Sequence, residues 1–136
     1  MTPRDAETAV FPLHEYGIAQ PTGRVQAPDI VALSLALTSH ADWRPGFTEV
    51  WDVRFAESVD LVPKDVPTML DVERRTREAL DGSTTVIVAT RPLILFSVKF
   101  YARLVKPLGR TVVAADSSQA AAALLGVDAL PDLRAR

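Results

Sequence analysis

The alternation of apolar and polar positions predicts strands and helices in turn along the chain. Short runs rich in β-branched and aromatic residues are typical of strands, and apolar residues three and four positions apart are typical of helices. The central prediction is a buried strand at 48–53, which follows a Pro-Gly turn. Further strands are expected at 9–13, 18–25, 84–89 and 110–115, and helices at 28–39, 65–80, 92–105 and 116–125.

This order, β-β-α-β-α-β-α-β-α, predicts a single α/β domain with a mixed, mostly parallel sheet of about five strands and about four helices. The first two strands should form an N-terminal hairpin that turns through 14–17. Pro12 and Pro21 each remove a backbone donor, which moves both strands toward a sheet edge or a bulge. The expected segments are a flexible N-terminus at 1–8, the domain at 9–126, an irregular connection at 56–62 and a loose C-terminal tail at 127–136.

Composition narrows the class of protein. The chain has 136 residues, 48% of them apolar and 24% charged, which is the profile of one soluble globular domain. A net charge of −2 gives no field that would attract nucleic acid, so no nucleic-acid partner is expected. Without cysteine there is no disulfide and no thiolate metal site.

Targeting signals are not visible in the sequence. The N-terminus has no apolar segment of the kind found in secretory signals. The longest apolar stretch, 93–108, contains Lys99, Arg103 and Lys106. It is too short and too charged to span a bilayer. We therefore expect a cytoplasmic protein without a membrane span.

Two runs around the central strand carry a family resemblance. They are Asp-Trp-Arg-Pro-Gly-Phe at 42–47 and Val-Trp-Asp-Val-Arg at 50–54. Together with the order of elements, and with Gly-Arg-Val at 23–25 before the first helix, the chain resembles the SpoIIAA-like family over about 18–125. That family is related to STAS domains and is sometimes grouped with the Sec14-like lipid binders. The resemblance implies a non-enzymatic regulatory or protein-interaction module.

The phosphorylation switch of the anti-sigma-antagonist STAS domains has no counterpart here. In those domains, a serine in an Asp-Ser-Ser-Gly run accepts phosphate from a partner kinase. The corresponding run at 60–63 has Leu61 and Val62 in place of the serines. Ser58 precedes the aspartate and is a poor substitute. The resemblance therefore implies the scaffold without the switch.

Candidate catalytic groups are few. His14 and His40 have no second metal ligand at a recognisable spacing, so we expect no metal, no cofactor and no catalytic residue. Asp52 falls near the carboxyl end of the central strand, where α/β folds place ligands. It could instead fix the following loop through hydrogen bonds. Because side chains alternate along a strand, Glu49 and Asp52 should point to opposite faces.

A ligand pocket is one hypothesis for the aromatic residues, because such pockets are mostly apolar. The alternative is that these aromatics belong to the core. A small apolar ligand or lipid would then be carried or sensed near the central strand and the third helix. The candidate ligand-binding residues are Trp51, Asp52, Phe55, Phe96 and Phe100.

The third helix, at 92–105, is apolar over more of its circumference than one core-facing stripe requires. We therefore expect it to contact a protein partner or a second copy of the chain, as in a homodimer, or an apolar ligand. Protein interaction is the leading hypothesis and ligand binding the alternative. The candidate interaction surface consists of Lys99, Tyr101, Arg103 and Lys106, although a solvated basic face would look the same.

Overall fold

The structure is a computed structural model that describes residues 7–135. Of the expected flexible N-terminus at 1–8, the first six residues lie outside the described part. Glu7 and Thr8 are described, and Thr8 is already the first residue of a strand. The first strand therefore begins one residue earlier than the apolar pattern predicts.

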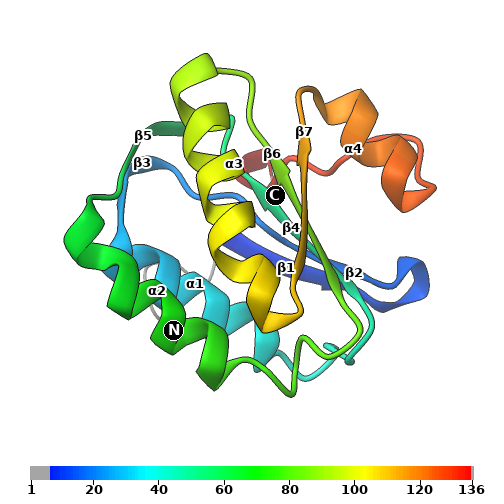
Figure 1. The fold of residues 1–136 in the computed structure, drawn as a ribbon. Helices are drawn as coiled ribbons and strands as arrows, with labels where there is room; N and C mark the ends of the chain where they lie inside the picture. Colours follow the sequence, from blue (N-terminus) through cyan, green and yellow to red (C-terminus); the bar gives the residue numbers. More distant parts are fainter. Residues whose placement is uncertain (1–6, 136) are drawn as a thin grey trace.

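A mixed five-stranded sheet forms the centre of the described chain, as predicted. Its strand order is β1-β2-β4-β6-β7, so the chain crosses the sheet mostly in sequence order (Figure 1). The first two strands pair antiparallel, and every later pair is parallel. The strands are β1 (Thr8–Phe11), β2 (Tyr16–Ala19), β4 (Thr48–Asp52), β6 (Thr84–Val88) and β7 (Thr111–Ala115).

Within residues 7–135, four α-helices cover the two faces of this sheet unequally. Three of them pack on one face, where Leu33 and Val98 meet Trp51 in one apolar cluster. The fourth packs on the other face through Ala121. The helices are α1 (Ala27–Thr38), α2 (Val66–Arg75), α3 (Pro92–Val105) and α4 (Ser118–Leu125). No helix in the described residues is both long and apolar enough to cross a membrane.

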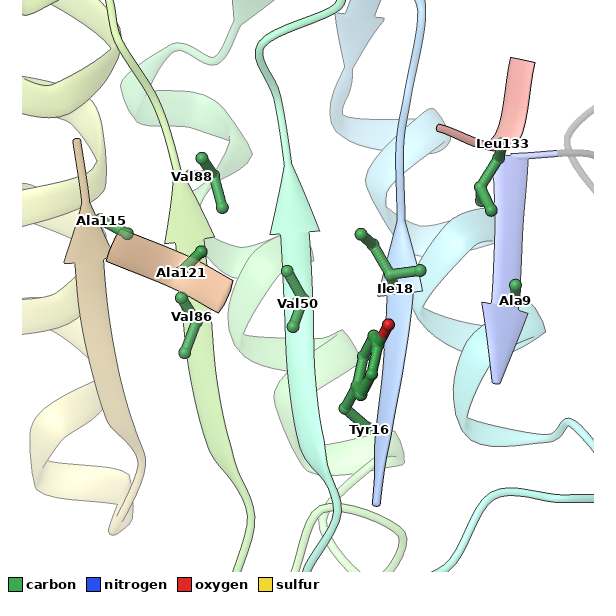
Figure 2. Close-up of a cluster of buried hydrophobic side chains, with 9 residues drawn as sticks. All are labelled: Ala9, Tyr16, Ile18, Val50, Val86, Val88, Ala115, Ala121 and Leu133. Carbon is green, nitrogen blue, oxygen red and sulfur yellow. The ribbon is translucent and has the colours of Figure 1, made fainter. Parts of the chain in front are cut away.

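The face covered by α4 is closely filled. Figure 2 shows it with α4 in front of the sheet and the other three helices behind. Ile18, Val50 and Val88 have no exposed surface at all. They are short, mostly β-branched side chains on neighbouring strands, so they interlock across the parallel ladders. These strand residues on this face therefore supply packing.

The C-terminal segment belongs to the same closed face. The sequence predicts a loose tail at 127–136, but Leu133 is buried beside Ala9 and Ile18 (Figure 2). Its backbone N–H donates to the Gln20 side chain over 2.8 Å. Burial of Leu133 and its hydrogen bond to Gln20 therefore hold the end of this segment against the sheet.

The expected turn at 14–17 lies two residues earlier, at 12–15, and has the same length. Tyr16 and Gly17 are strand residues of β2, and the turn is a 3-10 helix (Pro12–His14) followed by Glu15. Gly17 serves close packing, since a Cβ there would lie 2.8 Å from Leu37 Cδ1 and 2.9 Å from the Trp43 ring. Gly17 is therefore needed for close packing, although in the sequence it looks like a turn residue.

Two segments form other elements than those predicted, and these elements pair with each other. The expected strand at 18–25 is divided by Pro21 into β2 and β3 (Gly23–Gln26), and the expected irregular stretch at 56–62 contains β5 (Ala56–Asp60). β3 and β5 form a separate parallel pair with a register shift at Gly23. The order of elements thus contains two strands more than the sequence predicted.

Helix boundaries follow local chemistry. The third helix spans 92–105 as predicted. The second ends at Arg75 rather than near 80, because the Thr76 hydroxyl donates back to the Val72 carbonyl and the chain turns there. The N-cap of the fourth is Ser117 rather than Asp116, since the Ser117 oxygen accepts the Ala120 N–H.

Candidate functional site

A cavity of about 100 Å³ lies between the sheet and the three helices α1, α2 and α3. Its floor comes from β4 and β6, and its walls come from one side of each helix. These helices alternate with the strands they cover, so the same connections that build the parallel sheet also enclose the cavity. The apolar side chains that line it include Ile30, Trp51, Met69, Val72, Ile87, Ile94 and Val98.

One end of the cavity is polar. Glu73 of α2 accepts a hydrogen bond from the Tyr101 hydroxyl and an ion-paired hydrogen bond from Arg110 Nε at 3.0 Å. On the strands, Thr85 donates to Glu49 Oε1 over 2.9 Å. Arg110 Nη2 donates to the Thr85 oxygen and stands 3.6 Å from Glu49 Oε1. Two carboxylates therefore share one guanidinium.

Glu49 is incompletely satisfied within this cluster. Its residue is 4% exposed, and Oε2 has no hydrogen-bond partner in the described chain. Burial raises the pKa of Glu49, and the nearby Glu73 acts in the same direction, whereas Arg110 and Thr85 oppose the rise. Desolvation is the largest of these influences, because a buried carboxylate loses its hydration. The site thus contains a buried acid with one oxygen available to a ligand.

Tyr101 is held as a neutral phenol. Burial, followed by the charge of Glu73, raises the pKa of its hydroxyl above the ordinary tyrosine value. The hydroxyl therefore keeps its proton and donates it to Glu73. This contact fixes α3 against α2 at the cavity wall.

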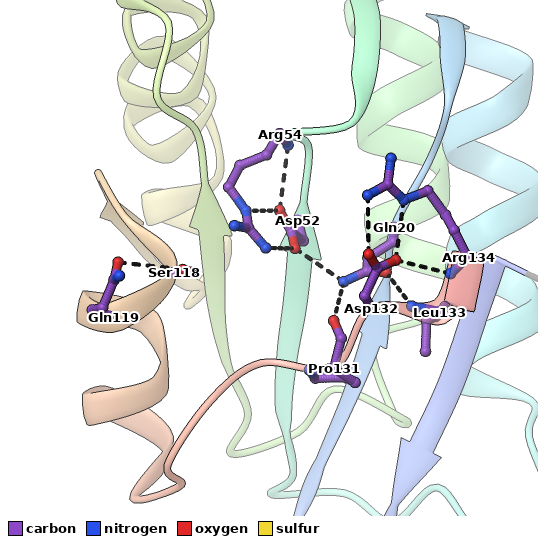
Figure 3. A network of polar contacts seen from close by, with 9 residues as sticks. All are labelled: Gln20, Asp52, Arg54, Ser118, Gln119, Pro131, Asp132, Leu133 and Arg134. Atoms are coloured by element: carbon purple, nitrogen blue, oxygen red, sulfur yellow. Dashed lines mark hydrogen bonds and ion pairs between the residues drawn. The ribbon is translucent and has the colours of Figure 1, made fainter. Parts of the chain in front are cut away.

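Asp52 belongs to a different network on the opposite face of β4 (Figure 3). It is fully buried and accepts hydrogen bonds from Gln20 Nε2 at 3.0 Å and from Arg54 Nε and Nη2 at 2.8 Å each. Gln20 also binds the C-terminal segment through the Pro131 carbonyl and the Leu133 N–H. Of the two roles considered for Asp52, these contacts favour the anchoring of the following loop.

The predicted ligand-binding residues do not gather in one place. Trp51 lines the cavity, but Asp52 faces away from it. Phe55 lies under the Arg134 guanidinium, which is 3.6 Å from the ring centroid. Phe96 and Phe100 are 74% and 59% exposed and do not line the cavity. Of the five predicted ligand-binding residues, Trp51 alone lines the cavity.

The predicted interaction residues also separate. Lys99, Arg103 and Lys106 are exposed on α3 and its C-terminal end. Tyr101 turns inward and lines the cavity. The exposed apolar residues of this helix are Leu93, Phe96 and Phe100.

The polar end of the cavity was largely missed by the sequence analysis. Glu73 lies in the helix expected at 65–80, as a charged residue between apolar positions of one face, and this interruption is the available signal. Arg110 was expected to begin the strand at 110–115, and it lies just before β7 with a side chain only 9% exposed. Thr85 looked like an ordinary strand residue. Their proximity depends on the parallel pairing of β4, β6 and β7.

Comparison with known proteins assigns no family. No protein-family model matches this chain, and no curated protein matches it. No cluster of three or more potential metal-ligating side chains occurs among residues 7–135. Any proposal about function therefore depends on the geometry of the cavity and its polar end.

Proposed function

We propose that the protein is a non-enzymatic binding module that holds a small, mainly apolar ligand between its sheet and the helices α1, α2 and α3. Such a module acts as a carrier or a sensor. The observation that carries the proposal is the apolar cavity with a few converging polar groups at one end. Ligand sites commonly combine an apolar lining with a small number of placed polar side chains.

The size of the cavity restricts the ligand. At about 100 Å³ it is somewhat smaller than the cavity of roughly 150 Å³ that binds benzene in an engineered protein. A compact molecule of about five or six non-hydrogen atoms fits this space. A long lipid chain would have to extend beyond the cavity.

The experiment is a binding titration with pentane as the apolar probe, read by thermal unfolding. Pentane should raise the unfolding temperature in a concentration-dependent way, because a ligand that binds the folded state stabilises it. Val98→Phe places a ring in the cavity and should remove this effect. Phe96→Ala is the matched control, since Phe96 lies on the same helix outside the cavity. No stabilisation of the parent by pentane would contradict the proposal.

Protein interaction is a second candidate function, favoured by the exposed apolar side chains of α3. Leu93 is 84% exposed, and Phe96 and Phe100 continue it at helical spacing. The resemblance to the SpoIIAA-like family supports a regulatory module of this type. Under this hypothesis, a second copy of the chain is the simplest partner, because a two-fold axis makes one patch self-complementary.

Two substitutions on α3 test this candidate. Phe100→Asp should abolish association in solution and leave the fold intact, because Phe100 is exposed. Tyr101→Asp should weaken the fold instead, since Tyr101 binds Glu73 at the cavity. Solution mass and thermal stability are the measurements. A parent protein that is monomeric at every concentration tested would contradict the self-association.

A further inference from the structure

The inference concerns the free oxygen of Glu49 at the polar end of the cavity. Glu49 is one of the lining residues, its side chain is 5% exposed, and Oε2 lacks a donor in the described chain. A buried polar atom without a partner loses the hydration it had in the unfolded chain. Such atoms are rare in folded proteins and are commonly explained by an ion, a water or a function.

The neighbouring donors are directed to atoms other than Glu49 Oε2. Arg110 donates Nε to Glu73, Nη1 to the Ser83 carbonyl at 3.0 Å and Nη2 to Thr85. The Thr85 hydroxyl donates to the other oxygen of Glu49. None of these hydrogen bonds reaches Oε2.

Two more neighbours complete the surroundings of the carboxylate. Tyr101 donates its hydroxyl to Glu73 and not to Glu49. A weak hydrogen bond from the Trp51 side chain to the Glu49 carboxyl group favours its ionised form slightly, but no donor stands within hydrogen-bond distance of Oε2. A molecule inside the cavity is in position to supply this donor.

The charges in the cluster indicate which kind of donor fits. Glu49 and Glu73 can together carry two negative charges, and Arg110 supplies one positive charge. A cationic donor would complete the pairing, and charge-assisted hydrogen bonds are about twice as strong as neutral ones. A trapped water would need two to four polar partners, whereas most of the lining is apolar.

We infer that the ligand is a small apolar amine, whose ammonium group donates to Glu49 Oε2 while its hydrocarbon part lies against Trp51, Ile87 and Val98. This inference rests on the proposed function, because it assigns the ligand of the same cavity. The raised pKa of Glu49 agrees with it, since a carboxylate that lacks its counter-ion is the form that burial disfavours.

The experiment compares three probes of equal length by calorimetry at neutral pH: pentane, butan-1-ol and butylamine. They differ only in the terminal group, which is a methyl, a hydroxyl or an ammonium. Butylamine should bind at least about tenfold more tightly than either of the others, as expected for a charged hydrogen bond in a buried site.

Glu49→Gln removes the charge and keeps the size of the side chain. It should reduce butylamine affinity by about tenfold or more and leave pentane affinity within about twofold. Asp52→Asn is the matched control, because it makes the same chemical change on the same strand but on the opposite face. It should leave the affinity of all three probes unchanged.

The outcomes separate the two proposals. If none of the probes binds, cavity binding itself is wrong and the amine with it. If pentane binds and butylamine binds no more tightly, the cavity function stands and the amine assignment is wrong. Equal affinities for butan-1-ol and butylamine would likewise contradict the assignment of a cationic donor.

The parent protein decides the question even if Glu49→Gln fails to fold. Its preference for butylamine over butan-1-ol should decline as the pH is lowered and Glu49 takes up a proton, because the protonated acid no longer pairs with an ammonium group. Glu73, Arg110 and Tyr101 are the other ionisable groups that face this position. A preference that is constant with pH contradicts the role of Glu49.

Discussion

Strand β4 places one carboxylate on each face of the sheet, and the two are treated very differently. On the closed face, Asp52 accepts hydrogen bonds from Gln20 and from Arg54, including the Arg54 backbone N–H at 3.3 Å. On the cavity face, Glu49 accepts from Thr85 through one oxygen, and its other oxygen has no partner in residues 7–135.

This difference separates a fully hydrogen-bonded carboxylate from one that keeps an unpaired oxygen beside a cavity. Fully satisfied buried networks fix one arrangement of the chain, whereas a partly satisfied group is costly. The apolar neighbours differ in the same way: Val50 is enclosed on the Asp52 side, and Trp51 borders the cavity on the Glu49 side. One face of the strand therefore serves stability, and the other is suited to a ligand.

Substitution of Trp51, which lies on the cavity face, should have the largest effect on stability. Trp51→Ala should lower the free energy of unfolding by about 3–5 kcal/mol, the usual range for removing a buried aromatic side chain. Urea unfolding followed by circular dichroism measures it. A denaturation midpoint equal to that of the parent would mean that Trp51 does not belong to the core.

Breaking the Asp52 network should come next. Asp52→Ala leaves Arg54 and Gln20 without their acceptor and should cost about 3 kcal/mol, the low end of the range for a broken buried ion pair. The low end applies because the Arg54 side chain is 24% exposed and regains some hydration. Thermal and urea unfolding measure the change. A loss below about 1 kcal/mol, the level of a surface ion pair, would contradict the structural role.

A pair of matched substitutions compares the packing of the two faces. Val50→Ile adds one methylene to the closed face and should cost about 1–3 kcal/mol, because extra volume strains a filled core. Val98→Ile adds the same group beside the cavity and should change stability by less than about 0.5 kcal/mol, or increase it by filling space. Urea unfolding of both variants is the measurement. Equal costs on the two faces would contradict the contrast.

The smallest effect concerns Glu49 and depends on pH. Because its folded-state pKa is raised, the native state binds the proton more tightly than the unfolded state. Stability of the parent should therefore fall as the pH rises above the ordinary glutamate range of about 4.3. Glu49→Gln has no such proton to lose.

The measurement is the difference in unfolding temperature between parent and Glu49→Gln from acid to neutral pH. The variant should gain on the parent as the pH rises, because only the parent loses a proton that its native state holds more tightly. A parent that gains stability relative to the variant over the same interval would show that Glu49 is better satisfied than its contacts indicate.

Much of the fold could be predicted from local sequence. The bounds of α3 follow from Pro92 at its start and Pro107 after its end, since proline is tolerated in a first turn and excluded from a helix interior. The run at 84–89, β-branched in all but its last residue and without polar alternation, predicts a strand covered on both faces, and β6 is covered in that way. Alternation along the central strand also placed Glu49 and Asp52 on opposite faces.

The candidate site could be predicted only in part. Trp51 was assigned correctly to the region of the cavity, because an aromatic residue in a central strand has to pack against the covering helices. Phe96 and Phe100 were assigned to the same pocket but are exposed, since the rotation of α3 about its axis turns Val98 and Tyr101 inward instead. A helix that is apolar on several sides does not reveal this rotation in its sequence.

What the sequence by itself determined is what depends on neighbours in the chain: the strand and helix periods, the proline and glycine boundaries, and the face on which each β4 side chain lies. Tertiary structure decided the contacts between distant segments. It pairs β3 with β5, packs Leu133 beside Ala9 and brings Arg110 between Glu49 and Glu73. These contacts depend on parallel register and on long-range packing, for which a local pattern of apolar residues carries no signal.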